Sequence, residues 1–220
     1  MNLCERNDLQ REELIERARI DRDALTERVM IIYPEFEGRP PAHWVEDLIV
    51  SMCGFRVNDF PLPRGQLGVC DVANRLVLVN SEMHAFVPDN KDLKAIRADT
   101  LGHELGHIRW HADELESLFV TRYGRWAQTR DPRLLQREQE ANLYAAVFLV
   151  PGEMLLRHPR GRQIYGAWKS QQRVRQDLLG EAVKEIAADF GVTIELMRRS
   201  LAERGWVSMA KNKRLSIRLS

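Results

Sequence analysis

The most restrictive feature of the sequence is a pair of histidines four residues apart, inside a stretch that favours an α-helix. Over residues 91–111, His103 and His107 share one face of the predicted helix, whereas Leu101 and Leu105 share the opposite face. Such a helix has an apolar back and a polar front. We therefore expect a buried helix that lines a cleft.

Glu104 follows the first histidine, which completes the motif H-E-x-x-H. Residues i and i+4 lie about one turn apart, so both imidazoles can reach one metal ion. The next residue lies about 100° around the helix, so its carboxylate is beside the metal, where a general base for an activated water has to be. Imidazole and carboxylate ligands favour zinc, and we expect one Zn²⁺ per chain.

A third protein ligand is expected, because a catalytic zinc usually has three and leaves one position for water. The candidates lie in a second predicted helix, residues 131–150. Glu138 and Asn142 share one face of it, and the small Ala141 leaves room for the first helix. We prefer Glu138 as the ligand and Asn142 as the residue that orients an imidazole. Glu140, about 200° from Glu138, is the competing ligand.

A further hydrogen-bond donor is expected to contact the substrate or to stabilise the oxyanion. Three residues are candidates: His111, one turn beyond the motif, Tyr144 in the second helix, and Tyr123 between the helices. The sequence does not choose between them.

Composition indicates a globular chain and limits its partners. The 220 residues are 44% hydrophobic and 30% charged, enough for one ordinary domain. The net charge of +1 argues against nucleic acid or an anionic membrane as the main partner. The charged N-terminal residues and the short apolar runs predict neither a secretory signal nor a membrane span. Three widely spaced cysteines predict free thiols and a cytoplasmic location.

Two other patterns predict local structure. Residues 67–72 and 76–80 look like two strands joined by a hairpin turn at Ala73 and Asn74. Residues 181–207 predict two short helices around Gly191, with Thr193 as the N-cap of the second.

The motifs resemble those of the ImmA/IrrE family of zinc metallopeptidases. The resemblance lies in Thr100–His107 (TLGHELGH), Glu138–Ala145 (EQEANLYA) and Phe148–Pro151 (FLVP), and no departure removes a ligand or the base. Residues 181–207 are more weakly similar to the helix-turn-helix-like segment that often follows in that family.

The resemblance implies an α+β, mostly helical fold. Its gluzincin-like core would pack a small twisted sheet or hairpin on the active-site helix and the ligand helix, with the helix-turn-helix-like segment after it. It implies that His103, His107 and Glu138 bind zinc and that Glu104 is the general base of peptide hydrolysis. The implied substrate is a helix-turn-helix repressor or an antitoxin of a prophage, mobile element, stress response or toxin–antitoxin pair.

This interpretation predicts an organisation in five parts. They are an N-terminal helical extension (1–55), a zinc peptidase core (56–152), an Arg/Gln-rich connection of surface structure (153–180), a helix-turn-helix-like segment (181–210) and a basic tail (211–220).

The alternative is a non-catalytic regulatory protein that binds a repressor or DNA on a peptidase scaffold. Arg198, Arg199 and Arg204 could face DNA, although the near-neutral charge argues against strong phosphate binding. A purely structural zinc site would require thiolates near the motif, and there are none. A deformylase would require a Cys ligand in its own motif, which the sequence around Cys70 does not supply.

Overall fold

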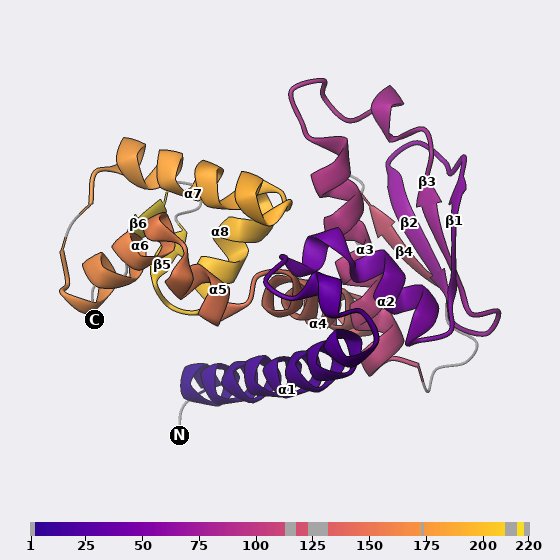
Figure 1. Cartoon of the computed structure of the whole chain (residues 1–220), viewed down its shortest axis with the longest axis horizontal. Helices are drawn as coiled ribbons and strands as arrows, with labels where there is room; N and C mark the ends of the chain where they lie inside the picture. The colour runs from indigo at the N-terminus through magenta and orange to yellow at the C-terminus, as the bar shows by residue number, and fades with distance from the viewer. Residues whose placement is uncertain (1–2, 113–117, 123–131, 173, 210–214, 218–220) are drawn as a thin grey trace.

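The computed structural model describes residues 3–112, 118–122, 132–172, 174–209 and 215–217, and within these ranges the fold is α+β and mostly helical, as predicted (Figure 1). The helices are α1 (Leu3–Ile32), α2 (Val45–Ser51), α3 (Leu93–Trp110), α4 (Pro132–Leu149), α5 (Gly152–Arg157), α6 (Pro159–Lys169), α7 (Gln176–Phe190) and α8 (Ile194–Glu203). The strands are β1 (Arg56–Phe60), β2 (Gln66–Asp71), β3 (Leu76–Asn80), β4 (Leu118–Arg122), β5 (Val207–Met209) and β6 (Leu215–Ile217). Short 3-10 turns span Pro34–Phe36, Pro41–His43 and Met83–Ala85.

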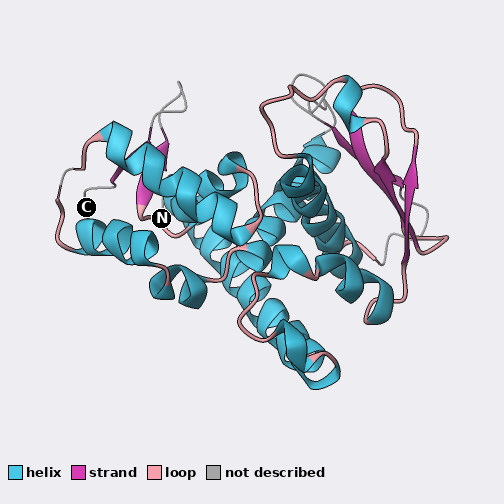
Figure 2. Ribbon diagram, turned by 45° about the horizontal axis from the view of Figure 1, so that its top comes forward, coloured by secondary structure: helices cyan, strands magenta, loops and turns pink. Residues whose placement is uncertain are grey.

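A twisted sheet of four described strands, in the order β1-β3-β2-β4, forms one side of the molecule. The predicted hairpin is confirmed, because β2 and β3 pair antiparallel with Val69 opposite Leu78. The sequence pattern did not indicate β1, which pairs parallel with β3, or β4, which pairs antiparallel with β2. The helices lie on one side of this sheet (Figure 2), so α3 is covered by the sheet on one flank.

Helix α3 lies between the sheet and α4, and is the centre of the fold (Figure 1). It begins where the Asp92 side chain accepts hydrogen bonds from the backbone N–H groups of Lys94 and Ala95, an N-cap that satisfies amides without helical partners. Helices α3 and α4 touch at Gly106, where a Cβ atom would lie 2.9 Å from the Cα of Ala141. Gly106 and Ala141 therefore let the motif helix and the ligand helix approach closely, a role that the sequence predicted for Ala141.

Helix α1 runs along α4 and ends near α2 (Figure 1). Its buried side chains include Ala18, Leu25 and Val29. Asp21 joins three helices, because it accepts hydrogen bonds from Tyr144 Oη of α4 at 2.5 Å and from Arg109 of α3 at 3.0 and 2.5 Å.

The described residues after α4 fold into four helices and a two-stranded ribbon beside the central helices (Figure 1). Residues 153–180, expected as surface structure, hold most of α5, all of α6 and the start of α7, and they bury Leu155 and Ile164 in the core. The segment expected as a basic tail is partly folded, because Leu215–Ile217 forms β6 against β5. Helices α7 and α8 are the two predicted after residue 180, and Thr193 caps α8 through the backbone N–H of Leu196.

Within the described residues, no helix combines the length and the apolar character needed to cross a membrane.

Candidate metal centre

Two imidazoles of α3 and one carboxylate of α4 meet in the space between these helices. The Nε2 atoms of His103 and His107 lie 3.0 Å apart. Glu138 Oε2 lies 3.2 Å from His103 Nε2, and Glu138 Oε1 lies 3.5 Å from His107 Nε2. One donor atom of each residue lies within 4.8 Å of the others, so the three can hold a metal ion. Glu138, not Glu140, completes this group.

Asn142 fixes the orientation of one imidazole. Its Oδ1 lies 3.3 Å from His103 Nδ1, and its Nδ2 donates to the backbone carbonyl of Glu138 at 2.7 Å. The second hydrogen bond fixes which amide atom is the oxygen, so the imidazole must donate from Nδ1. The lone pair on His103 Nε2 then faces the cluster, as a metal ligand requires.

The protonation states of His103, His107 and Glu138 favour the binding of a cation. Burial lowers the pKa of His107 to about 3, so its imidazole is neutral near pH 7. Burial opposes the charge of Glu138, but hydrogen bonds from both histidines lower its pKa to about 2. Burial also opposes protonation of His103, yet the Glu138 and Glu104 carboxylates raise its pKa. The donor set is a neutral imidazole, a carboxylate and a second imidazole, His103, whose proton a metal can displace. These donors fit a divalent metal ion.

Glu104 is completely buried against the sheet. A Cβ atom on Gly68 of β2 would lie 2.8 Å from Glu104 Oε1 and 2.7 Å from Thr100 Cγ2. The missing side chain at Gly68 therefore makes the space that the Glu104 carboxylate occupies. Gly68 has no local sequence signal for this role, because only the sheet brings it to the motif helix.

Two of the three candidates for oxyanion or substrate contact, His111 and Tyr144, are engaged elsewhere. His111 is 5% exposed, and its two ring nitrogens lie 3.0 Å from His107 Nδ1 and 3.0 Å from Glu140 Oε2. The buried Tyr144 donates its hydroxyl to Asp21, so the structure directs it toward α1. Tyr123 lies outside the described residues. The tyrosine–aspartate contact has no sequence signal, since its partners are 123 positions apart.

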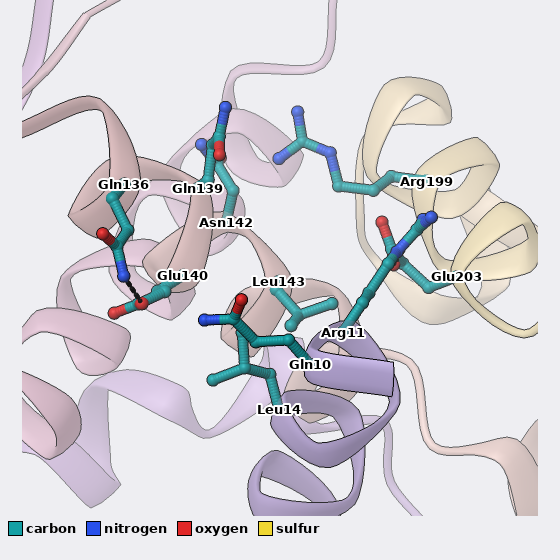
Figure 3. A pocket seen from close by; sticks show the side chains of 10 residues that line it. All are labelled: Gln10, Arg11, Leu14, Gln136, Gln139, Glu140, Asn142, Leu143, Arg199 and Glu203. Atoms are coloured by element: carbon teal, nitrogen blue, oxygen red, sulfur yellow. Dashed lines mark hydrogen bonds and ion pairs between the residues drawn. The ribbon is translucent and has the colours of Figure 1, made fainter. Parts of the chain in front are cut away.

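A polar cavity of about 620 Å³ adjoins the residues that support the imidazoles (Figure 3). Asn142 and Glu140 of α4 form part of its wall, and α1 and α8 complete it. The lining residues are Gln10, Arg11, Leu14, Gln136, Gln139, Glu140, Asn142, Leu143, Arg199 and Glu203.

Comparison with known families agrees with this geometry. The model of the IrrE N-terminal-like domain (Peptidase_M78) matches residues 89–202, which is more than half of the chain. The match includes the helices from α3 to α7 and all of α8 except its last residue. The chain belongs to the ImmA/IrrE peptidase family. No curated protein matches the chain at a significant level of sequence similarity.

Membership of the ImmA/IrrE family identifies the activity as that of a metallopeptidase in general terms. The cluster of His103, His107 and Glu138 gives this family assignment a place where a metal ion can bind. The match begins after β3, so the strand that carries Gly68 lies outside it.

Proposed function

We propose that this ImmA/IrrE protein is a zinc-dependent, site-specific endopeptidase with a gluzincin-like core. The observation that carries the proposal is the convergence of two imidazole nitrogens and a carboxylate beside a buried glutamate. Two nitrogen donors and one carboxylate are the ligands of many catalytic zinc sites, which keep a position open for water. Zinc would be held by His103, His107 and Glu138.

When bound there, zinc would polarise a water molecule and the scissile carbonyl. Glu104 would accept the proton of the attacking water on a carboxylate oxygen and deliver it to the leaving amine. Its burial against Gly68 keeps the carboxylate in a fixed position, and fixed position is a large part of the efficiency of a general base. Asn142 would keep the Nδ1–H of His103 turned away from the metal.

The proposed substrate is a cytoplasmic helix-turn-helix repressor or an antitoxin, which the family resemblance implies. Hydrolysis at one site would inactivate such a protein and release its operator or its toxin.

The alternative of a DNA-binding protein finds less support in α8. Arg204, one of the three arginines that could face DNA, donates to the backbone carbonyls of Ser200 and Val150 inside the protein. Burial lowers the pKa of Arg204 to about 10, as expected for a largely buried guanidinium. This arginine is therefore committed to holding α8 against the end of α4.

The test compares wild type with Glu104→Gln and Glu138→Ala, each reconstituted with zinc and dialysed. We expect one zinc per chain in wild type and in Glu104→Gln, and loss of zinc in Glu138→Ala. New protein N-termini in cells that express wild type, absent from cells that express Glu104→Gln, would identify the cleaved bond. Full zinc content with no such N-terminus, and no cleavage of purified repressors, would favour the non-catalytic alternative.

A further inference from the structure

A line of side chains continues outward from His107, on the side away from the candidate metal site. His107 Nδ1 lies 3.0 Å from His111 Nδ1, and His111 Nε2 lies 3.0 Å from Glu140 Oε2. Glu140 Oε1 accepts a hydrogen bond from Gln136 at 2.9 Å, which is visible in Figure 3. His111 is 5% exposed, so little water competes for its ring nitrogens.

The hydrogen atoms in this line can be assigned from the chemistry of the two rings. Nδ1 atoms that face each other can share a hydrogen bond only if one carries the hydrogen and the other accepts. When His107 Nε2 supplies its lone pair to a metal, the neutral ring carries its hydrogen on Nδ1. His111 must then accept at Nδ1 and carry its own hydrogen on Nε2, which faces the Glu140 carboxylate. Every donor thus meets an acceptor.

A hydrogen bond in the opposite direction, from His111 to His107, is incompatible with a metal ion bound by His107. If His111 donated from Nδ1, His107 would have to carry its hydrogen on Nε2, which is 3.0 Å from His103 Nε2. That hydrogen would occupy the position that a metal requires. Only one direction of the line is compatible with a metal-binding His107.

We propose that His111 and Glu140 are positioning residues that hold the His107 ring in its metal-binding tautomer and orientation. The proposal rests on the proposed function only in taking His107 Nε2 as a metal ligand. It gives Glu140 a role that its sequence position did not suggest, since its carboxylate acts through two imidazoles rather than on the metal. It also gives His111 a role other than contact with the substrate.

The two imidazoles proposed as metal ligands have different outer hydrogen-bond partners. His103 has a neutral amide as its outer partner, at 3.3 Å, whereas the line from His107 ends in a carboxylate through two contacts of 3.0 Å. A carboxylate at the end of such a line makes the ligating nitrogen a stronger base. Loss of an outer partner of this type typically weakens metal affinity by about 10- to 100-fold.

The test measures Zn²⁺ affinity of the metal-free full chain by competition with a chromophoric chelator. We expect His111→Ala to weaken binding by about 10- to 100-fold, and Glu140→Gln to weaken it less, because an amide oxygen still accepts but has no charge. His111→Asn should recover part of the loss, since its side-chain oxygen can lie near the position of Nδ1.

A matched control is available away from the site. His158 also pairs with a carboxylate through Nε2, at 2.9 Å from Asp189 Oδ2 on α7. His158→Asn removes a histidine–carboxylate pair without touching α3 or α4, so its zinc affinity should equal that of wild type.

A second readout reports the tautomer directly. Long-range ¹H–¹⁵N spectra of the zinc-loaded wild type should show His107 with its hydrogen on Nδ1 and His111 with its hydrogen on Nε2. His111 protonated on Nδ1 would overturn the proposal even if His111→Ala failed to fold. Wild-type zinc affinity in both His111→Ala and Glu140→Gln would also overturn it. Neither result depends on peptide cleavage, so a wild type that binds zinc but cleaves nothing would refute only the proposed function.

Discussion

Gly68→Ala should separate metal binding from catalysis. The new Cβ would lie 2.8 Å from Glu104 Oε1 and 2.7 Å from Thr100 Cγ2, whereas ordinary contacts begin at 3.4 Å. Strand β2 cannot easily retreat, because it is paired with β3 on one side and β4 on the other. The Glu104 carboxylate therefore has to move by about 0.6 Å, the difference between 3.4 and 2.8 Å.

The effect on rate follows from this displacement. A misplacement of about 1 Å in a catalytic group can cost about 100-fold in rate, so we expect kcat to fall by about 10- to 100-fold. None of the three candidate ligands touches the new methyl group among its nearest neighbours, so the zinc content should stay at one per chain. Steady-state cleavage of a peptide that contains the identified bond, with elemental analysis of the same sample, measures both quantities.

Gly180→Ala is the matched control, because a Cβ at this position in α7 meets no atom within 4 Å. It should leave kcat unchanged and raise the free energy of unfolding by roughly 0.5–1 kcal/mol. If Gly68→Ala kept one zinc per chain and the wild-type kcat, the position of the Glu104 carboxylate would not depend on this space. The position assigned to the general base would then be wrong.

Three further predictions concern the helix contact, the proton balance and the pH dependence. Gly106→Ala should lose zinc in elemental analysis, because its Cβ would lie 2.9 Å from the Cα and 3.0 Å from the carbonyl oxygen of Ala141 and would push α4, with its ligand, away from α3; full zinc content would contradict this. Zinc binding near pH 7 should release protons, because nearby carboxylates raise the pKa of His103 despite its burial; calorimetry in buffers of different ionisation enthalpy should show a buffer-dependent heat, and identical heats would refute it. Burial raises the pKa of Asp99 from 3.8 to about 7, so the folded state holds this proton more tightly, and the free energy of unfolding should decrease as pH rises from about 4 to about 7. Urea unfolding of Asp99→Asn should show a smaller decrease over that range, and an unchanged slope would contradict the assignment.

The sequence predicted the helices that carry the site, because their signals are local. The i, i+4 spacing of His103 and His107 and the shared face of Glu138 and Asn142 hold for any α-helix. The angle between Glu138 and Glu140 lets only one of them face the metal, and the small Ala141 and the Asn142 on the face of Glu138 favoured Glu138, which the structure brings to the histidines.

Features that depend on distant pairing could not be predicted in this way. The strand β1 has charged and polar residues at Arg56, Asn58 and Asp59, so it lacks the alternation that marks a half-buried strand. It forms because its backbone pairs with β3. Likewise, β6 lies in a basic stretch, and Leu215 and Ile217 are buried because β6 pairs with β5 and packs against α6 and α7.

The contacts of Asp21 have a consequence for how this protein could have diverged. Its carboxylate accepts from both Tyr144 and Arg109, so α1 supplies a counter-charge to the motif helix and an acceptor to the ligand helix. A lineage that lost α1 would leave the Tyr144 hydroxyl without its acceptor, and the partly exposed Arg109 guanidinium would lose its counter-charge. We expect loss or gain of α1 in related chains to be accompanied by changes at positions 109 and 144. The presence of α1 in a relative could then be inferred from the residues at these two positions of α3 and α4.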